Sequence, residues 1–245
     1  MQLVPVITFS NENVIHPAPK EPKLISNSLL PSFKKQLTPP PGQTDQAQKR
    51  DESELLSLQK SRTSEDCKRA ASEVMVSVNS FFGPPYGPLN STTAKKLAPF
   101  FEQVRNDADY YIQLLKKEYP RQRPLLYMKN ITPCVAKEVT GAYPSGHSTI
   151  AKLYALILSD LYPNKKEDLL RRADQIALDR VVVGMHHPTD IQTGKKLGEM
   201  VYAELKKSKS FSESFSAIKP ESVIKLTQTI LVTFQSQKNP NPILL

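Results

Sequence analysis

Apolar positions recur every three or four residues along much of the chain, which is the spacing of a helix with one buried face. Over residues 95–118 they form a single stripe, and Pro120 ends the pattern. The same period predicts three further helices, over residues 146–161, 166–182 and 188–207. No stretch alternates between apolar and polar residues as a half-buried strand does. The pattern therefore predicts an all-α fold, a compact helical bundle.

Shorter helical patterns come before this stripe. A first short helix is expected around Leu55, and a second from Thr63 or Ser64, which are both good N-caps, toward Phe81. Prolines and glycines crowd residues 81–88 and predict a loop there.

Composition divides the chain into three parts. Residues 1–48 hold eight of the 21 prolines and are predicted to be a Pro-rich arm, extended or disordered. Residues 49–207 carry the helical pattern and form the predicted domain. Residues 208–245 are interpreted as a Ser-rich linker and a tail, and the pattern leaves the state of 220–236 open.

The net charge of +9 raises the question of nucleic acid binding, but its distribution argues against it. Residues 51–205 carry 21 basic and 19 acidic side chains, so the excess of positive charge lies in the two ends. No basic run is interleaved with aromatic residues. We therefore expect no nucleic acid partner.

No apolar stretch has the length of a transmembrane helix, because residues 150–162 are interrupted by Lys152 and Asp160. The N-terminus lacks the basic start of a cleavable secretory signal, so none is expected, and the compartment stays open between the cytoplasm and export by another route.

Cys67 and Cys134 have no metal-site spacing and are expected to be buried and reduced rather than bonded.

Arg180 is the first sign of chemistry, because it lies on the buried face of its helix, four residues after Ile176. A buried guanidinium is costly unless an anion pairs with it. That anion is either an acid of the chain, such as Glu138 or Asp174, or a bound ligand. Lys116 lies beside its own helix's apolar stripe, where the alternative is a surface lysine whose stem covers apolar side chains.

The sequence Pro144-Ser145-Gly146-His147 leads directly into a predicted helix. The unpaired N–H groups and the dipole of such an N-terminus attract anions. Ser145 adds a hydroxyl group, and Gly146 allows a ligand oxygen to approach the backbone. His147 is then expected beside the bound anion. The alternative is an ordinary serine cap with a histidine in solvent.

The third motif is His186-His187-Pro188-Thr189-Asp190. Pro188 moves His187 out of the helical conformation, so Asp190 lies in the first turn of the next helix. From there Asp190 can point back at His186, fix its tautomer and stabilise its protonated form. Alternatively, Asp190 is only a first-turn acid favoured by the dipole. His187 is interpreted as a bystander.

Together the motifs resemble the signature of the type 2 phosphatidic acid phosphatase superfamily, which is Lys-x6-Arg-Pro, Pro-Ser-Gly-His and Ser-Arg-x5-His-x3-Asp. The matching residues outside the second motif are Lys116, Arg123, Pro124, Arg180, His186 and Asp190. Their order and helical context resemble the soluble branch, the class A bacterial non-specific acid phosphatases, roughly over residues 54–207. Asp179 replaces the usual Ser, which puts in doubt any contact made at that position.

The resemblance implies an acid phosphatase that hydrolyses phosphomonoesters through a phosphohistidine. His186 would be the nucleophile, Asp190 would orient it, and His147 would protonate the leaving group and then activate water. The phosphate oxygens would be held by Lys116, Arg123, Ser145, Gly146 and Arg180. No metal ion or other cofactor is implied, and the spacings typical of metal ligands are missing from the sequence.

Two other functions share these motifs. The first is a vanadium-dependent haloperoxidase, which has the same pocket but generally a larger helical scaffold than this chain. The second is a non-catalytic phosphate-binding interaction protein, which would not need the acid–base groups His186, Asp190 and His147. The substrate stays open among small phosphomonoesters, with lipid and nucleotide phosphates included. Phe81, Phe82 and Tyr86 are either an apolar wall for a leaving group or part of the core. The oligomeric state is not indicated.

Overall fold

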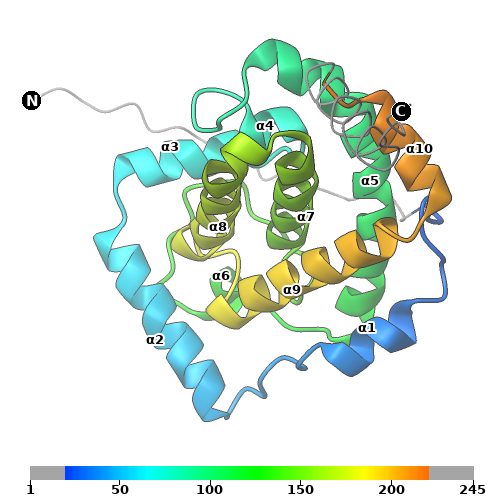
Figure 1. Cartoon of the computed structure of the whole chain (residues 1–245). Coiled ribbons are helices and arrows are strands. Elements are labelled where there is room, and N and C mark those ends of the chain that lie inside the picture. Colours follow the sequence, from blue (N-terminus) through cyan, green and yellow to red (C-terminus); the bar gives the residue numbers. More distant parts are fainter. Residues whose placement is uncertain (1–19, 221–245) are drawn as a thin grey trace, which may run out of the picture.

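A computed structural model of the chain describes residues 20–220 (Figure 1). Its helices are α1 (Leu30–Gln36), α2 (Gln46–Ser61), α3 (Ser64–Ser72), α4 (Val78–Phe82), α5 (Ser91–Glu118), α6 (Pro124–Tyr127), α7 (Gly146–Leu161), the 3-10 turn η1 (Pro163–Lys165), α8 (Lys166–Val182), α9 (Pro188–Leu205) and α10 (Lys209–Ala217). The described range contains no strand, so the predicted all-α fold is confirmed. All but the first residue of segment 220–236 lies outside this range.

Helix α7 lies at the centre of the bundle and packs against α5, α8 and α9 (Figure 1). Its apolar side chains, such as Ile150, are almost fully buried. Helix α9 approaches α7 closely through Gly194 and Gly198, where a Cβ atom would lie 2.6 Å from the Ser145 carbonyl oxygen and 2.5 Å from that of Thr149. Glycine at these two positions therefore lets the first turns of α7 lie directly against α9.

The Pro-rich N-terminal arm is not extended throughout, because it contains α1, and α2 begins within it at Gln46. Phe33 of α1 is buried against Tyr111 of α5, with ring centroids 4.9 Å apart. Asp107 of α5 binds the part of the arm that precedes α1. Its carboxylate accepts hydrogen bonds at 2.6–3.0 Å from the backbone N–H groups of Lys23, Leu24 and Ile25. The arm is thus part of the folded structure from about Lys23 onward.

Two other segments differ from their predicted form. The helix expected from residue 63 or 64 toward Phe81 is divided into α3 and α4, because Ser77 forms a capping box with Ser80 and starts a new helix. The Ser-rich linker expected over residues 208–218 is almost entirely the helix α10, whose Phe211 and Phe215 are buried against Phe100. The segment was interpreted as a linker because of its serines, although two phenylalanines in it are four residues apart, as on one face of a helix.

Cys67 and Cys134 form a disulfide with their Cα atoms 5.8 Å apart, so the expectation of two reduced cysteines was wrong. The bond joins α3 to the irregular segment between α6 and α7. The two residues are 67 positions apart in the sequence, and only the tertiary structure brings them together.

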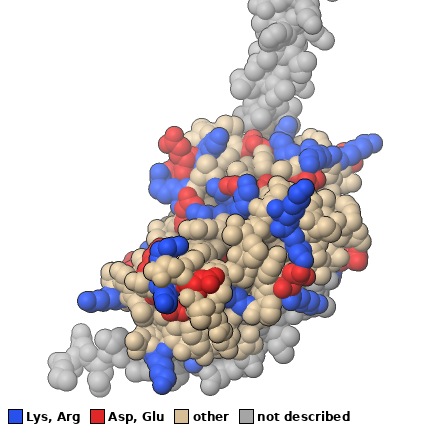
Figure 2. Space-filling view, turned by 90° about the horizontal axis from the view of Figure 1, so that it is seen from below, with Lys and Arg blue, Asp and Glu red and all other residues tan. Residues whose placement is uncertain are grey.

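The surface agrees with the charge distribution read from the sequence. On the face shown in Figure 2, Lys and Arg side chains are interspersed with Asp and Glu, and no continuous basic stripe crosses it. Within residues 20–220, none of the helices has the combined length and hydropathy needed to cross a bilayer.

Candidate active site

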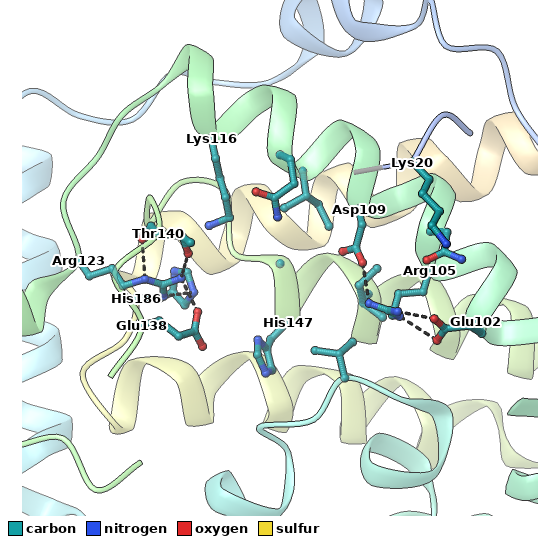
Figure 3. Close-up of a pocket in the computed structure, with 16 residues that line it drawn as sticks. Lys20, Glu102, Arg105, Asp109, Lys116, Arg123, Glu138, Thr140, His147 and His186 are labelled. Atoms are coloured by element: carbon teal, nitrogen blue, oxygen red, sulfur yellow. Dashed lines mark hydrogen bonds and ion pairs between the residues drawn. The ribbon is translucent and has the colours of Figure 1, made fainter. Parts of the chain in front are cut away.

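Most of the predicted site residues meet at one cavity of about 300 Å³ beside α5 and the first turn of α7 (Figure 3). The predicted residues that line it are Lys116, Arg123, Gly146, His147 and His186. The other three, Ser145, Arg180 and Asp190, are buried behind this lining. The cavity thus joins the three motifs, which come from α5, the segments before α6 and α7, and the α8–α9 connection.

The turn between α8 and α9 sets the position of His186. Gly184 has a φ of 77°, which favours glycine, and a Cβ there would lie 2.4 Å from Ile131 Cγ2. This conformation lets the backbone N–H groups of Met185 and His186 donate to the carbonyl oxygen of Arg180 at 3.0 and 3.1 Å. The chain therefore folds back, and His186 lies beside the end of α8 that carries Arg180.

The imidazole of His186 is buried between a cation and a carboxylate. Its Nε2 lies 2.9 Å from Arg123 Nη1, and its Nδ1 lies 3.6 Å from Asp190 Oδ2. A guanidinium only donates, so Nε2 is the accepting nitrogen and Nδ1 carries the proton, on the side of Asp190. Burial, followed by the charge of Arg123, lowers the pKa of His186 to about 3. The ring is therefore neutral near pH 7.

Asp190 is held more tightly by His187 than by His186. Its Oδ2 accepts hydrogen bonds from the backbone N–H of His187 at 2.8 Å and from His187 Nδ1 at 3.0 Å, while Oδ1 accepts from Arg121 Nη1 at 2.6 Å. Burial opposes ionisation, but contacts with both histidines and the charge of Arg121 hold the pKa of Asp190 well below its usual value. His187, whose Nε2 lies 2.9 Å from the Tyr127 hydroxyl oxygen, is therefore not a bystander.

The first turn of α7 is fixed at the cavity by Ser145. Its backbone N–H donates to the carbonyl oxygen of Asp190 at 3.1 Å, which ties α7 to α9. Its side-chain oxygen caps the helix by accepting from the Ser148 backbone N–H at 3.4 Å and the Ser148 hydroxyl at 3.0 Å. Gly146, the next residue, lies at the cavity surface. The N-terminus of a 16-residue helix thus faces the cavity.

His147 is only 7% exposed, so the alternative of a histidine in solvent was wrong. Its Nε2 lies 3.1 Å from the backbone carbonyl oxygen of Glu73. A carbonyl oxygen only accepts, so Nε2 carries a proton and Nδ1 is the nitrogen left for proton exchange. Burial, followed by the charge of Arg180, lowers the pKa of His147 well below its usual value.

Glu138 joins the two buried arginines of the site. Its Oε2 accepts from Arg123 Nη2 at 2.5 Å, and its Oε1 accepts from Arg180 Nη2 at 2.6 Å. Burial opposes ionisation, but the two guanidinium charges hold the pKa of Glu138 well below its usual value. Of the acids considered for Arg180, the partner is therefore Glu138, while Asp174 pairs with Lys195 on the surface.

Lys116 points into the cavity, contrary to the alternative of a surface lysine (Figure 3). Its Nζ donates to the carbonyl oxygen of Gly141. Burial, followed by the positive charge of Arg123, lowers the pKa of Lys116 to about 7. Lys116 therefore adds a third basic group beside Arg123 and Arg180, whose two guanidinium groups have the single carboxylate of Glu138 between them, and this arrangement favours a bound anion.

Asp179, the residue that departs from the resembled signature, has a definite partner. Arg69 of α3 donates to it twice, from Nε at 2.7 Å and from Nη2 at 2.6 Å. This two-pronged contact fastens α3 to α8. Beside it Arg172 Nη2 lies 2.8 Å from Glu73 Oε1, in the segment that contacts His147. The sequence alone did not indicate Arg69 or Glu73.

The cavity wall is not formed by the aromatic residues considered for it. Phe81 and Phe82 are fully buried in the core, and the Tyr86 hydroxyl donates to Glu65. Of the two roles left open by the sequence, both phenylalanines therefore have that of core residues. Away from Lys116 the wall comes largely from α5, through the polar residues Glu102, Arg105, Asn106, Asp109 and Gln113, and the apolar side chains of Val76, Ile112 and Ile150 complete it. These polar residues of α5 are spaced three and four apart and lie on the same helix face as Lys116, so the sequence pattern could have identified them as part of the site.

Within the described range, no group of three or more His, Cys, Asp and Glu side chains is arranged to hold a metal ion. The positive charges at the cavity are those of lysine and arginine.

Comparison with known proteins agrees with this geometry. Residues 108–210 match the sequence model described as the PAP2 superfamily, and this range holds every residue predicted for the site. The chain therefore carries a PAP2 superfamily domain, and the resemblance inferred from the sequence is confirmed.

The similar proteins are named for different phosphatase activities. The chain is 29% identical to the non-specific acid phosphatase of Salmonella typhimurium, over 76% of this chain and 78% of that protein. It is 30% identical to the lipid A 1-phosphatase of Rhizobium etli, over 35% of this chain and 38% of that protein. A transmembrane PAP2 type phosphatidylglycerolphosphate phosphatase from Bacillus subtilis superposes with a TM-score of 0.48 at 17% identity, over 73% of this chain and 91% of that one.

Proposed function

We propose that the protein is a metal-independent phosphatase that hydrolyses phosphomonoesters through a phosphohistidine at His186. One observation supports this most directly. The accepting nitrogen of a neutral His186, Nε2, lies 2.9 Å from Arg123 in a cavity that also receives Lys116 and the N-terminus of α7. A nucleophile beside donors for phosphate oxygens is what phosphoryl transfer to a histidine requires.

In the first step, the lone pair of His186 Nε2 attacks phosphorus and the P–O bond to the leaving group breaks. His147 takes up a second proton, on Nδ1, when the phosphate dianion binds, because the negative charge of the substrate opposes the burial and the charge of Arg180 that lower its pKa in the empty site. It gives this proton to the departing oxygen, since its Nε2–H is occupied by the carbonyl oxygen of Glu73. As the new N–P bond forms, His186 becomes positively charged. Asp190, 3.6 Å from Nδ1, stabilises that charge.

In the second step, water attacks the phosphohistidine. His147, now without its extra proton, accepts one from the water at Nδ1 as the N–P bond breaks. The products are phosphate and neutral His186, and the enzyme returns to its starting state. The same nitrogen thus serves as acid and then as base.

The oxygens of the transferred group gain charge that the protein must balance. Arg123, Arg180 and Lys116 supply the balancing positive charge, and the backbone N–H groups at the start of α7 add hydrogen-bond donors. For Arg123 and Arg180, phosphate would take the place of the Glu138 carboxylate, which binds both guanidinium groups. Since these cations belong to the chain, no metal ion is required for this task.

The test is phosphate release from phenyl phosphate by the purified protein, before and after exhaustive treatment with a chelator. We expect full activity after chelation and its loss in His186→Ala, while the exposed control Lys129→Ala keeps it. Activity that needs a restored divalent ion would contradict metal independence. Oxidation of halide by peroxide in the presence of vanadate, without phosphate release, would instead support a haloperoxidase.

A further inference from the structure

The cavity extends beyond the phosphate-binding residues along one face of α5. Asp109 lies seven residues before Lys116 and Arg105 lies eleven before it, which places them about 10 Å and about 16 Å away along the helix axis. Both line the same cavity as Lys116 and His147 (Figure 3). This second region therefore lies where the leaving group of a bound phosphomonoester would extend.

The charged groups of α5 in this region are paired with one another. Arg105 Nη1 donates to Asp109 Oδ2 at 2.9 Å, and its Nε donates to Glu102 Oε2 at 3.0 Å, with a further contact from Nη2 to Glu102. Asn106, from the adjacent turn of α5, also lines the cavity. A guanidinium braced by two carboxylates presents donors and acceptors side by side, and none of these groups has a part in the phosphoryl transfer described above.

We infer that Arg105, Asp109 and Glu102 form a subsite for the leaving group and that it selects leaving groups bearing several hydroxyls, such as a sugar or the ribose of a nucleoside. This inference rests on the proposed phosphatase function. A hydroxyl both donates and accepts, so adjacent hydroxyls can donate to the carboxylates and accept from the guanidinium or from Asn106.

The charge of the subsite argues against two other kinds of leaving group. Lys20 and Arg105 are matched by Glu102 and Asp109, so there is no net positive charge for a second phosphate. An acyl chain would remove these four charged groups from water without offering them a hydrogen bond. A neutral, hydroxyl-rich group fits both conditions.

The experiment compares two substrates of similar length, ribose 5-phosphate and n-pentyl phosphate, by kcat/KM for phosphate release. Adenosine 5′-monophosphate distinguishes a sugar site from a nucleoside site. The variants are Arg105→Met and Asp109→Leu. Arg171→Met is the matched control, because Arg171 contacts Asp168 three residues earlier, as Arg105 contacts Glu102, but on an exposed part of α8.

We expect the wild type to prefer ribose 5-phosphate, and this preference to fall about tenfold in each subsite variant, the effect of losing one hydrogen bond. The control should keep the wild-type ratio. A wild type that prefers pentyl phosphate, or a ratio unchanged in both subsite variants, would overturn the inference.

A binding measurement separates this inference from the proposed function. The rise in melting temperature caused by ribose 5-phosphate and by pentyl phosphate is measured for the same proteins, and it requires no turnover. If phenyl phosphate is not hydrolysed, the phosphatase proposal fails, but a larger rise with the sugar phosphate that is lost in Arg105→Met still supports the subsite. Equal rises for both ligands would overturn the subsite even in an active enzyme.

Discussion

Glu138, which lines the cavity, accepts a hydrogen bond of 2.6 Å at Oε1 from Arg180 Nη2 behind the cavity wall, and its other oxygen binds Arg123. The chain thus supplies an anion of its own where a phosphate would be bound. In Glu138→Gln the two guanidinium groups lose their counter-charge and repel each other and Lys116. We expect a lower melting temperature in phosphate-free buffer and a larger gain on adding inorganic phosphate than in the wild type.

The matched control is Glu204→Gln, which removes a partly exposed carboxylate paired at 2.7 Å with the exposed Lys207, away from the cavity. It should change neither the melting temperature nor the gain from phosphate appreciably. A Glu138→Gln protein with the wild-type response to phosphate would show that the carboxylate and phosphate do not share a site.

The neutral state of His186 predicts a pH dependence of stability. Burial and Arg123 lower its pKa to about 3 in the folded state, against about 6.5 when unfolded. Between these values only the unfolded state binds the proton, so the free energy of unfolding falls as the pH falls, by up to about 1.4 kcal/mol per unit. We expect His186→Gln to lose less stability than the wild type between pH 6.5 and 5. Equal losses, measured by chemical denaturation, would contradict the assignment of a neutral buried ring.

His187 should matter for holding Asp190. In His187→Leu the carboxylate loses the donor at 3.0 Å while it stays buried, which costs about 1–3 kcal/mol of unfolding free energy. In His187→Asn the amide N–H₂ lies close to the former position of Nδ1, and we expect it to restore part of that loss. Urea denaturation of both variants provides the test. Equal destabilisation by Leu and Asn would show that the ring is needed only for packing.

The Cys67–Cys134 disulfide should stabilise the fold substantially. It closes a loop of 67 residues, for which chain entropy alone predicts about 4 kcal/mol. The double variant Cys67→Ser, Cys134→Ser is therefore expected to unfold at lower denaturant concentration than the oxidised wild type. Reduced wild-type protein should match the double variant. No difference between oxidised and reduced protein would show that the bond is not formed in solution.

The helices that position the site could be predicted from the sequence because each has a clear apolar period. The 95–118 stripe gives Lys116 its place, and Pro188 marks the start of α9. The three motifs could be assigned to one anion site because their residue types complete one reaction. These predictions depend on local sequence, and the boundaries of α5, α7, α8 and α9 agree with them within a few residues.

What the sequence did not reveal depends on contacts between distant segments. Arg69 and Asp179 are 110 positions apart, and no local pattern links them. The sequence predicts a contact of Asp190 with His186 alone, whereas His187, three positions before this acid at a helix start, also reaches it. In each case the missing information is which elements lie side by side.

The central claim, that His186 takes the phosphoryl group while His147 moves protons, is tested most directly by mass spectrometry of protein quenched without acid during turnover of phenyl phosphate. We predict a phosphoryl adduct mapped to His186 in the wild type. It should accumulate in His147→Ala, where water is no longer activated, and be missing in His186→Ala. An adduct that persists in His186→Ala, or that maps to His147 in the wild type, would contradict the account.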